Sequence, residues 1–444
     1  MIRLLYNLLW PLGLILFLPG YMVKMFRRGG YRANFGQRLG IYHVDVCKRL
    51  RNQEAIWVHA VSVGEVGIAL KVITAVHDLD ANAAFVLTTT TTTAYAVATK
   101  NGPASVEVLY APLDFWPIMR RAFKTIRPRK LVLVEAEVWP NLVAEAHARR
   151  IPVALVNARL SSRSEKRFRR FAWFVRSTFR LLDLVLLPEQ ADVQRWHALG
   201  VQRERIHPVG SVKYDPQNVP IDQTVPQTVL RQLKIDNRPV LLGGSTHPGE
   251  EEVLAHVFRA LRRDFPELLL IIAPRHAERA RAVGRLLEQM DLRVTLRSCA
   301  SGKERGLDCL VLDSTGELRN WYAVATVVFI GKSLLVHGGQ NPAEAIVARK
   351  PVVFGPHMEN FANFARALVD RAGAIQIRSA DELRRAVVDL LQHRAARERL
   401  ITNASAVLSA HAGATVRTAK LISVLQLAEN HSTSRNAGQF ALHG

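Results

Sequence analysis

Two series of short, continuously apolar runs constrain the fold of this chain more than any other feature. The runs are rich in Val, Ile and Leu and do not alternate with polar residues, which is typical of strands buried on both faces of a parallel sheet. Segments long enough for a crossover helix separate the runs. The sequence therefore predicts an α/β protein with two Rossmann-like, doubly wound domains.

The two series are separated by a proline-containing stretch, residues 214–237, with little apolar periodicity until its end. The first series comprises Ala55–Ala60, Ala83–Thr88, Val106–Ala111, Lys130–Glu135, Pro152–Asn157 and Leu182–Pro188. The second comprises Pro239–Gly244, Leu268–Pro274, Asp308–Ser314, Thr326–Gly331, Pro351–Gly355 and Ala374–Ser379. We expect an N-terminal segment with a basic flank (1–40), a first domain (41–213), a linker (214–237), a second domain (238–429) and a loose polar tail (430–444).

Residues Leu4–Val23 form an apolar run in which Asn7 is the one strongly polar residue. A run of about twenty residues is long enough to cross a hydrocarbon core of roughly 30 Å, so we expect a membrane anchor. The basic residues that follow the run predict a cytoplasmic body and argue against a cleaved signal peptide. Prolines and glycines within the run leave two forms open, a spanning helix and a segment lying in the interface.

The charge balance limits the class of partner. Lys and Arg number 60 against 38 Asp and Glu, which gives a net charge of +22. Such a field attracts nucleic acid, anionic lipid or phosphorylated substrates. The three cysteines are an odd number and lack C-x-x-C spacing, so the sequence supports neither a disulfide framework nor a cysteine zinc site and favours a reducing compartment.

Acidic residues follow two strands of the first domain, where open parallel sheets bind their ligands. Glu65 comes after the first strand, either facing a ligand or simply favoured by the start of a helix. Glu135 and Glu137 follow the fourth strand, and helix capping does not explain both. After the fifth strand a helical stretch with an aromatic stripe (Phe168, Phe171, Val175 and Phe179) is surrounded by arginines; ordinary core, anionic headgroups and RNA are the alternatives.

In the second domain, polar residues follow several strands in the same way. Ser245 and Thr246 follow the first strand, Arg275 the second, and Thr315, Gly316 and Glu317 the third. The segment from His337 to Phe361 has two glycines, then Asn341 as an N-cap, Pro342 at N1 and Glu344 one turn into a helix. A phosphate can rest on such a helix start while Glu344 accepts hydrogen bonds from a ribose, although a capping box explains Glu344 locally as well.

Eight motifs, in order along nearly the whole chain after residue 40, resemble those of the 3-deoxy-D-manno-octulosonic acid (Kdo) transferases. They are HAVSVGE, VEAEVWPNL, NARLSSRS, GSVKYD, STHPGEEE, PRH, TGEL and GGQNPAEA. The resemblance implies a GT-B glycosyltransferase that moves Kdo from CMP-Kdo onto a lipid A precursor (lipid IVA) in lipopolysaccharide biosynthesis. It further implies an inverting reaction without a metal or other cofactor, an acceptor-binding first domain and a nucleotide-binding second domain.

Site residues carry over from the family motif by motif. The resemblance makes Glu65 the general base and makes Glu135 and Lys213 supports of the transition state. It places CMP at Pro274 and Arg275, at Thr315, Gly316 and Glu317, and at Asn341, Pro342, Ala343 and Glu344. Ala136, Gln340 and Ala345 depart from the usual family residues without removing a proposed catalytic group.

The expected partners are CMP-Kdo, a lipid A precursor and anionic lipid of the inner membrane, on its cytoplasmic side, and we expect no nucleic acid. Two alternatives remain at the level of sequence. One is a GT-B transferase for another nucleotide sugar or acceptor, and the other is a non-catalytic basic protein that binds membrane or nucleic acid.

Overall fold

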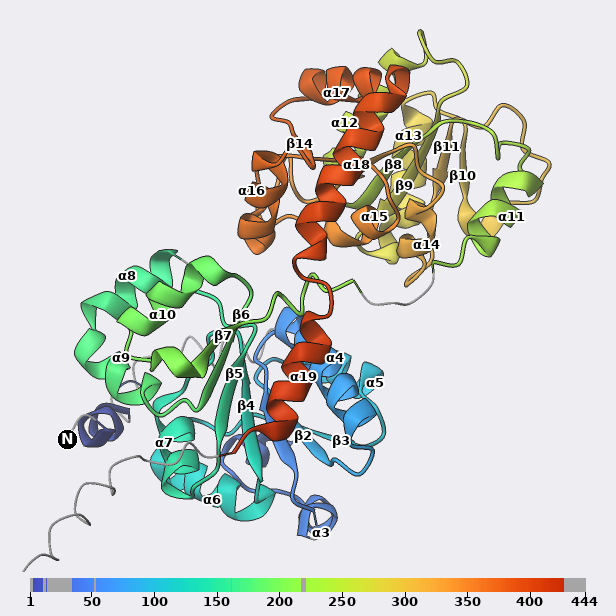
Figure 1. Cartoon of the computed structure of the whole chain (residues 1–444). Coiled ribbons are helices and arrows are strands. Elements are labelled where there is room, and N and C mark those ends of the chain that lie inside the picture. Colours follow the sequence, from blue (N-terminus) through green and yellow to red (C-terminus); the bar gives the residue numbers. More distant parts are fainter. Residues whose placement is uncertain are drawn as a thin grey trace, which may run out of the picture. The chain divides into compact units, whose positions relative to one another are not determined.

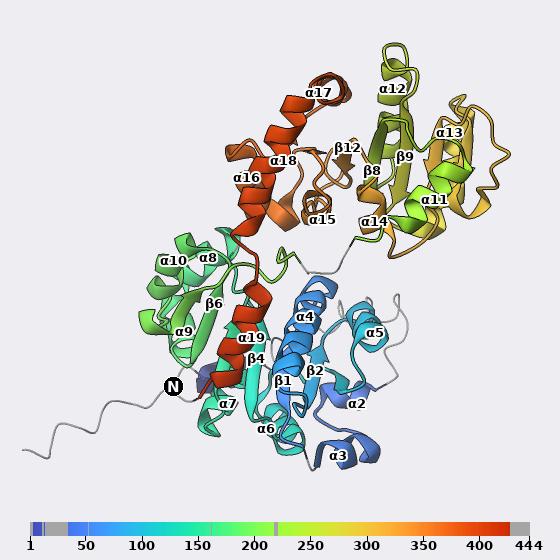
Figure 2. The same cartoon turned by 45° about the vertical axis from the view of Figure 1, so that its right-hand side comes forward.

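The computed structural model describes residues 3–10, 13, 34–51, 53–160, 162–216 and 221–426, and they form two compact units (Figures 1 and 2). Unit 1 consists of the described residues up to Asp215 together with those from Gly413 onward. Unit 2 runs from Pro216 to Ala412. Each unit is built around one seven-stranded sheet in which every pairing is parallel. The predicted pair of doubly wound α/β domains is confirmed.

The sheet of unit 1 has the strand order β3-β2-β1-β4-β5-β6-β7. Its strands are β1 (Ile56–His59), β2 (Phe85–Thr89), β3 (Val106–Tyr110), β4 (Lys130–Val134), β5 (Val153–Val156), β6 (Leu184–Leu187) and β7 (Ile206–Pro208). Its helices are α2 (Phe35–Arg38), α3 (Val44–Arg51), α4 (Val63–Leu79), α5 (Thr92–Asn101), α6 (Trp116–Ile126), α7 (Pro140–Ala148), α8 (Ser162–Arg170), α9 (Ala172–Phe179), α10 (Val193–Ala198) and α19 (Ala414–Val424).

The sheet of unit 2 has the order β10-β11-β9-β8-β12-β13-β14. Its strands are β8 (Val240–Thr246), β9 (Leu269–Pro274), β10 (Val294–Leu296), β11 (Cys309–Val311), β12 (Val327–Ile330), β13 (Val352–Phe354) and β14 (Ile375–Gln376). Its helices are α11 (Thr224–Gln232), α12 (Glu250–Leu261), α13 (Ala280–Gln289), α14 (Leu318–Tyr322), α15 (Ala343–Val347), α16 (Ala362–Asp370), α17 (Ala380–Gln392) and α18 (Arg394–Ser409).

Each of the twelve predicted apolar runs overlaps a strand, and most of these strands are fully buried, whereas β3 and β14 are partly exposed. Two strands, β7 and β10, were not predicted. Each has three residues and lies at or near one end of its sheet, where side chains such as His207 are half-buried. A strand of that length, without a continuous apolar run, leaves little periodic signal in the sequence.

The second domain does not extend to residue 429 as expected, because α19 belongs to unit 1. Ala419, Ile422 and Leu425 are buried in the core of that unit, and α19 packs along α4 (Figure 1). The proposed linker also differs, since residues 224–232 form α11 within unit 2. Burial of the apolar face of α19 by unit 1 decides its place, and the helical periodicity alone could not assign it to either domain.

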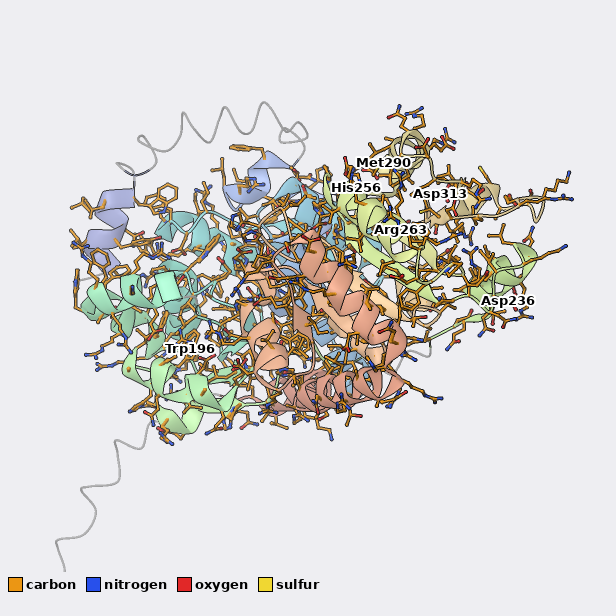
Figure 3. All side chains as sticks on the ribbon, turned by 90° about the horizontal axis from the view of Figure 1, so that it is seen from above. Trp196, Asp236, His256, Arg263, Met290 and Asp313 are labelled. Carbon is orange, nitrogen blue, oxygen red and sulfur yellow. The ribbon has the colours of Figure 1, made fainter. Side chains whose placement is uncertain are left out.

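The aromatic stripe after the fifth strand is divided between core and surface. The helix breaks at Phe171, which is 48% exposed, whereas Val175 and Phe179 are buried. Phe179 stacks on Trp196, a fully buried residue labelled in Figure 3, with ring centroids 5.6 Å apart. The expectation of a single apolar face is therefore wrong at Phe171, because a new helix starts there.

Most of the apolar run Leu4–Val23 and the whole tail 430–444 lie outside the described residues. Residues 3–10 are helical. Within the part of the chain that the structure describes, we find no helix with both the length and the apolar character needed to cross a membrane.

Candidate active site

The carboxyl ends of the strands in unit 1 bring several charged side chains together at the point where the strand order reverses. β1 pairs with β2 on one side and with β4 on the other. Ligands of doubly wound sheets bind at such a switch point. Glu65 follows β1, Glu135 and Glu137 follow β4, and Lys213 comes after β7.

Glu65 lies in the first turn of α4 and is only 8% exposed. Its carboxylate accepts hydrogen bonds from the Val61 N–H (2.7 Å) and the Ser62 hydroxyl (2.8 Å), and Ser62 caps the helix in return. Glu65 thus does support the helix start, as the alternative interpretation holds. A helix cap does not require the two acidic neighbours, Glu137 and Glu135. Burial, and then repulsion from these two carboxylates, outweigh the hydrogen bonds and raise the pKa of Glu65 to about 7.

Glu135 and Glu137 are held by the turn that ends β4. Glu135 has a φ of 59°, a left-handed conformation that few non-glycine residues adopt, and such strain gathers at functional sites. The Glu137 carboxylate accepts a hydrogen bond from the Trp139 indole at 2.9 Å. Burial first, and then the nearby Glu135, raise the pKa of Glu137. Three carboxyl groups therefore share this end of the sheet.

Lys213 supplies a positive charge in the same region. Burial lowers its pKa, the neighbouring Glu135 opposes that effect, and Arg159 adds to it. Asn157, at the end of β5, fixes the backbone before Lys213, because its side-chain oxygen accepts from the Ser211 hydroxyl (3.0 Å) and the Val212 N–H (3.1 Å). The three residues predicted as catalytic are thus linked through Glu135, which interacts electrostatically with both Glu65 and Lys213.

Two contributors to this cluster were not singled out from the sequence. Asn157 has a φ of 51° and a buried side chain whose oxygen accepts two hydrogen bonds, which makes it a positioning residue. Arg159 acts on the charge of Lys213. An Asn directly after a buried strand is a signal for a left-handed turn and could have drawn attention to Asn157. Arg159 also follows β5 closely and lies within the motif NARLSSRS, so its position after a strand is the signal that could have identified it.

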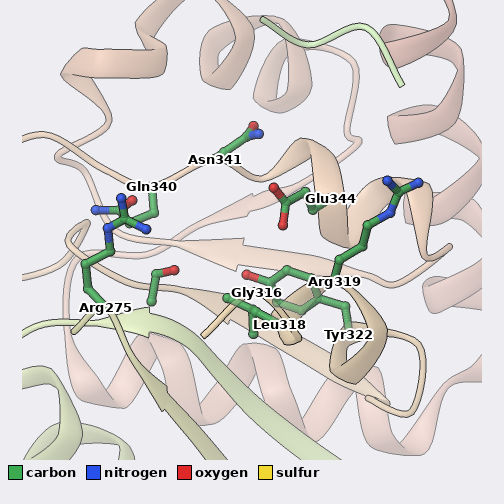
Figure 4. Close-up of a pocket in the computed structure, with 9 residues that line it drawn as sticks. Arg275, Gly316, Leu318, Arg319, Tyr322, Gln340, Asn341 and Glu344 are labelled. Atoms are coloured by element: carbon green, nitrogen blue, oxygen red, sulfur yellow. The ribbon is translucent and has the colours of Figure 1, made fainter. Parts of the chain in front are cut away.

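Unit 2 has a pocket of about 360 Å³ at the carboxyl end of its own sheet (Figure 4). It is lined by Ser245, Arg275, Gly316, Leu318, Arg319, Tyr322, Gln340, Asn341 and Glu344. Ser245 lies near the end of β8, and the other residues follow β9, β11 or β12. The volume is within the range of small-molecule sites, and the lining offers both cationic and acidic groups.

The glycine pair at the end of β8 shapes this pocket. A Cβ on Gly244 would lie 2.3 Å from the Tyr322 hydroxyl, so only glycine lets Tyr322 approach the strand. Ser245 follows with a φ of 56° and lines the pocket. Burial raises the pKa of Tyr322, with Glu344 adding to that effect and Arg275 opposing it. Figure 4 shows Arg275 beside Gln340 and Glu344 above Tyr322.

The start of α15 differs by one residue from the prediction. The helix begins at Ala343 with Pro342 as its N-cap residue, rather than with Pro342 at N1. The side-chain oxygen of Asn341 accepts from the Ala343 N–H at 3.1 Å, a local turn that shifts the cap. Asn341 and Glu344 both line the pocket.

Of the other residues predicted to bind CMP, some line the pocket and others do not. Arg275 and Gly316 line the pocket, whereas Pro274, Thr315, Glu317, Pro342 and Ala343 are not among its lining residues. Glu317 instead pairs with Arg297 at 3.1 Å and accepts from the Ser314 hydroxyl at 2.9 Å. The sequence reasoning missed Leu318, Arg319 and Tyr322, which α14 brings into the wall, because the motif TGEL ends before most of that helix.

Comparison with known proteins agrees with the two-domain fold. A glycotransferase of kitacinnamycin shares the two-domain fold, with a TM-score of 0.52, 16% identity, and coverage of 84% of this chain and 99% of that one. The family model described as 3-deoxy-D-manno-octulosonic-acid transferase matches residues 33–216.

Two relatives match over most of their length. The 3-deoxy-D-manno-octulosonic acid transferase of Haemophilus influenzae is 32% identical over 88% of this chain and 91% of the relative. The enzyme of the same name from Bordetella pertussis is 33% identical over 82% of this chain and 85% of the relative. With its GT-B fold and these matches, the chain belongs to the 3-deoxy-D-manno-octulosonic acid (Kdo) transferase family of glycosyltransferases.

Proposed function

We propose that this protein transfers Kdo from CMP-Kdo to a lipid A precursor, with inversion, in lipopolysaccharide biosynthesis. Glu65 is the general base that takes the proton from the acceptor hydroxyl. Glu135 and Lys213 support the charge that develops in the transition state, and the pocket of unit 2 binds the CMP portion of the donor. Family membership supports the transfer of Kdo, and the geometry of the two sites supports these roles.

The observation that carries the proposal is the environment of Glu65. An ordinary glutamate is too weak a base to deprotonate an alcohol efficiently, and catalysis is best when the pKa of the base lies near the working pH. Burial beside Glu137 and Glu135 gives Glu65 a pKa of about 7. A site that only capped a helix would have no need for two more carboxyl groups.

The lining of the unit 2 pocket suits a cytidine monophosphate group. A guanidinium such as that of Arg275 binds phosphate oxygens through two parallel hydrogen bonds. A carboxylate such as that of Glu344 accepts hydrogen bonds from ribose hydroxyls. Arg319 adds a second cation to the wall, so a leaving phosphate can be stabilised by the protein's own side chains.

We propose further that the N-terminal segment attaches the protein to the cytoplasmic side of the inner membrane. The helix at residues 3–10 has one polar face bound to unit 1: Arg3 donates to Asn141 and Glu145, and Tyr6 donates to Asp114. The opposite face carries Leu4 and Leu8, 76% and 71% exposed. Exposed leucines on a helix fixed in this way suit insertion into the acyl boundary of a bilayer.

Aromatic and basic side chains of α8 and α9 support the same attachment. Trp173 and Phe171 are exposed, and Arg167, Arg169 and Arg170 precede them. Tyr6 packs against Phe174 of α9, with ring centroids 5.9 Å apart, so this surface is continuous with the N-terminal helix. Interfacial aromatic residues and arginines together favour anionic lipid and a phosphorylated glycolipid acceptor.

The test is incubation of the purified chain with CMP-Kdo and a tetraacylated lipid A precursor, read by mass spectrometry. We expect the mass of the acceptor to rise by added Kdo, and Glu65→Gln to lower the rate by about 10²-fold or more, the scale of a lost general base. The matched control is Glu54→Gln, which changes an exposed glutamate at the opposite end of β1 and leaves the rate unchanged. Equal rates for the two variants would show that Glu65 is not the general base.

A further inference from the structure

A cluster of metal-binding side chains lies outside both sites described above. His337, His357 and Glu359 each offer one ligand atom, and these three atoms lie within 4.8 Å of one another. His337 belongs to the loop after β12, and the other two belong to the loop after β13. None of the three lines the pocket of unit 2.

The geometry of the three side chains is close to that of a zinc site. One oxygen of Glu359 lies 2.7 Å from Nδ1 of His337 and 3.4 Å from Nδ1 of His357. The two imidazole rings lie side by side, tilted by 57° with centroids 4.0 Å apart. Ligand atoms at Zn–N and Zn–O distances of about 2.0–2.1 Å in a tetrahedral arrangement are separated by about 3.3 Å. The His357–Glu359 spacing of 3.4 Å is close to this value.

The backbone holds the two loops together around this cluster. The other oxygen of Glu359 accepts from the Gly338 N–H at 2.6 Å, and the Asn360 N–H donates to the Gly338 carbonyl at 2.9 Å. Gly339 has a φ of +70°, and a Cβ there would lie 2.6 Å from the Met358 sulfur. Such contacts orient the ligating carboxylate, as hydrogen bonds behind metal ligands do in known sites.

We propose that His337, His357 and Glu359 bind a zinc ion with two imidazoles, one carboxylate and a water molecule. His337 and Glu359 move apart by about 0.6 Å to reach the tetrahedral spacing. In the bound state the ion takes the place of a hydrogen on Nδ1 of His337, and the ring carries one hydrogen at Nε2. The carboxylate exchanges its hydrogen bond from His337 for a bond to zinc.

The ion ties the loop after β12 to the loop after β13. The first of these loops continues into Gln340 and Asn341, which line the pocket. The zinc therefore stabilises one wall of that pocket and takes no part in the transfer reaction. The proposal does not depend on the proposed substrates.

The experiment is isothermal titration of ZnCl₂ into the chelator-treated full chain at pH 7.5. We expect one ion per chain at this site, and His337→Ala, His357→Ala and Glu359→Gln each to weaken it by about tenfold or more, since losing even an indirect partner of a metal ligand costs about 10–100-fold. Glu359→Gln keeps an oxygen that can accept from Gly338 and so separates metal binding from the hydrogen bond.

The matched control is His393→Ala, which removes an exposed histidine that pairs with Asp389 at 2.8 Å. We expect this variant to bind zinc as the native chain does. Thermal unfolding without zinc checks that each variant folds, and zinc raises the melting temperature of the native chain more than that of His337→Ala. The proposal is overturned if a variant lacking all three side chains binds zinc with unchanged stoichiometry and affinity.

Discussion

The carboxylate of Asp215 accepts a hydrogen bond at 2.9 Å from the backbone N–H of Gly413, a residue 198 positions later in the chain. Its second oxygen accepts from the Thr415 N–H at 2.7 Å. Asp215 is the last residue of unit 1 before the chain enters unit 2, and Gly413 is the first after it returns. The buried side chain of Asp215 thus caps α19 and joins the residue at which the chain leaves unit 1 to the residue at which it returns.

Asp215→Ala is expected to destabilise unit 1 by about 1–3 kcal/mol, because two orphan N–H groups at the start of α19 lose a charged acceptor. Urea unfolding followed by circular dichroism measures the loss. Asp236→Ala, at an exposed position of unit 2, serves as the control and should unfold at the native midpoint. Equal midpoints for the two variants would mean that solvent replaces the Asp215 cap.

The rate of Kdo transfer should depend on pH through Glu65. Its pKa is raised to about 7, so the fraction of ionised base falls as the pH is lowered through that value. We expect kcat/KM to drop about tenfold for each pH unit below 7 and to level off above it. The residual activity of Glu65→Gln should lack this limb, and Glu54→Gln should retain it. A native profile that is flat between pH 5 and 8 would contradict the assignment.

Glu137→Gln should move the limb of that profile to lower pH. The carboxylate of Glu137 raises the pKa of Glu65 by repulsion, and a neutral amide removes that effect while still accepting from Trp139. The pH profile of kcat/KM measures the shift. Glu107→Gln removes a carboxylate on β3 that pairs with Arg49, and this variant should leave the limb at its native pH. A limb that moves upward in Glu137→Gln would refute the repulsion.

Arg275→Ala should weaken the binding of CMP to the full chain by about 10- to 100-fold, the range expected for a lost pair of charge-assisted hydrogen bonds. Protection against thermal unfolding by CMP, with UDP and GDP beside it, measures the affinity and the base preference. Arg285→Ala, at an exposed position on α13, is the control for loss of charge. Protection by UDP in place of CMP would favour a transferase for a different nucleotide sugar.

Replacing Leu4 and Leu8 together by serine should reduce binding to vesicles that contain anionic lipid. Each leucine side chain that leaves the acyl boundary forfeits about 1.5–3 kcal/mol. Vesicle flotation measures the bound fraction. Leu79→Ser, an exposed leucine at the end of α4, is the control and should bind as the native chain does. Unchanged flotation of the double variant would place the membrane contact elsewhere.

Much of this architecture could be predicted from local sequence. Continuous apolar runs such as Leu131–Val134 and Leu269–Ile272 identify strands buried on both faces, and their alternation with helical segments predicts parallel sheets. Since ligands bind at the carboxyl ends of such strands, the position of a charged residue after a strand made Glu65, Glu135, Arg275 and Glu344 candidates. A helix start remained an alternative explanation for Glu65 and Glu344, and the family resemblance supplied the proposed roles.

The tertiary structure decided features in which residues distant in sequence meet. The helical pattern of residues 414–424 does not reveal that Ala419 and Ile422 are buried in unit 1, because amphipathicity shows that a helix needs a partner surface and not which one. Likewise, the raised pKa of Glu65 depends on Glu137, more than seventy residues away, and on the exclusion of water around both. The sequence determined which chemical groups stand at the ends of the strands, and only packing determined their spacing and desolvation, on which the chemistry depends.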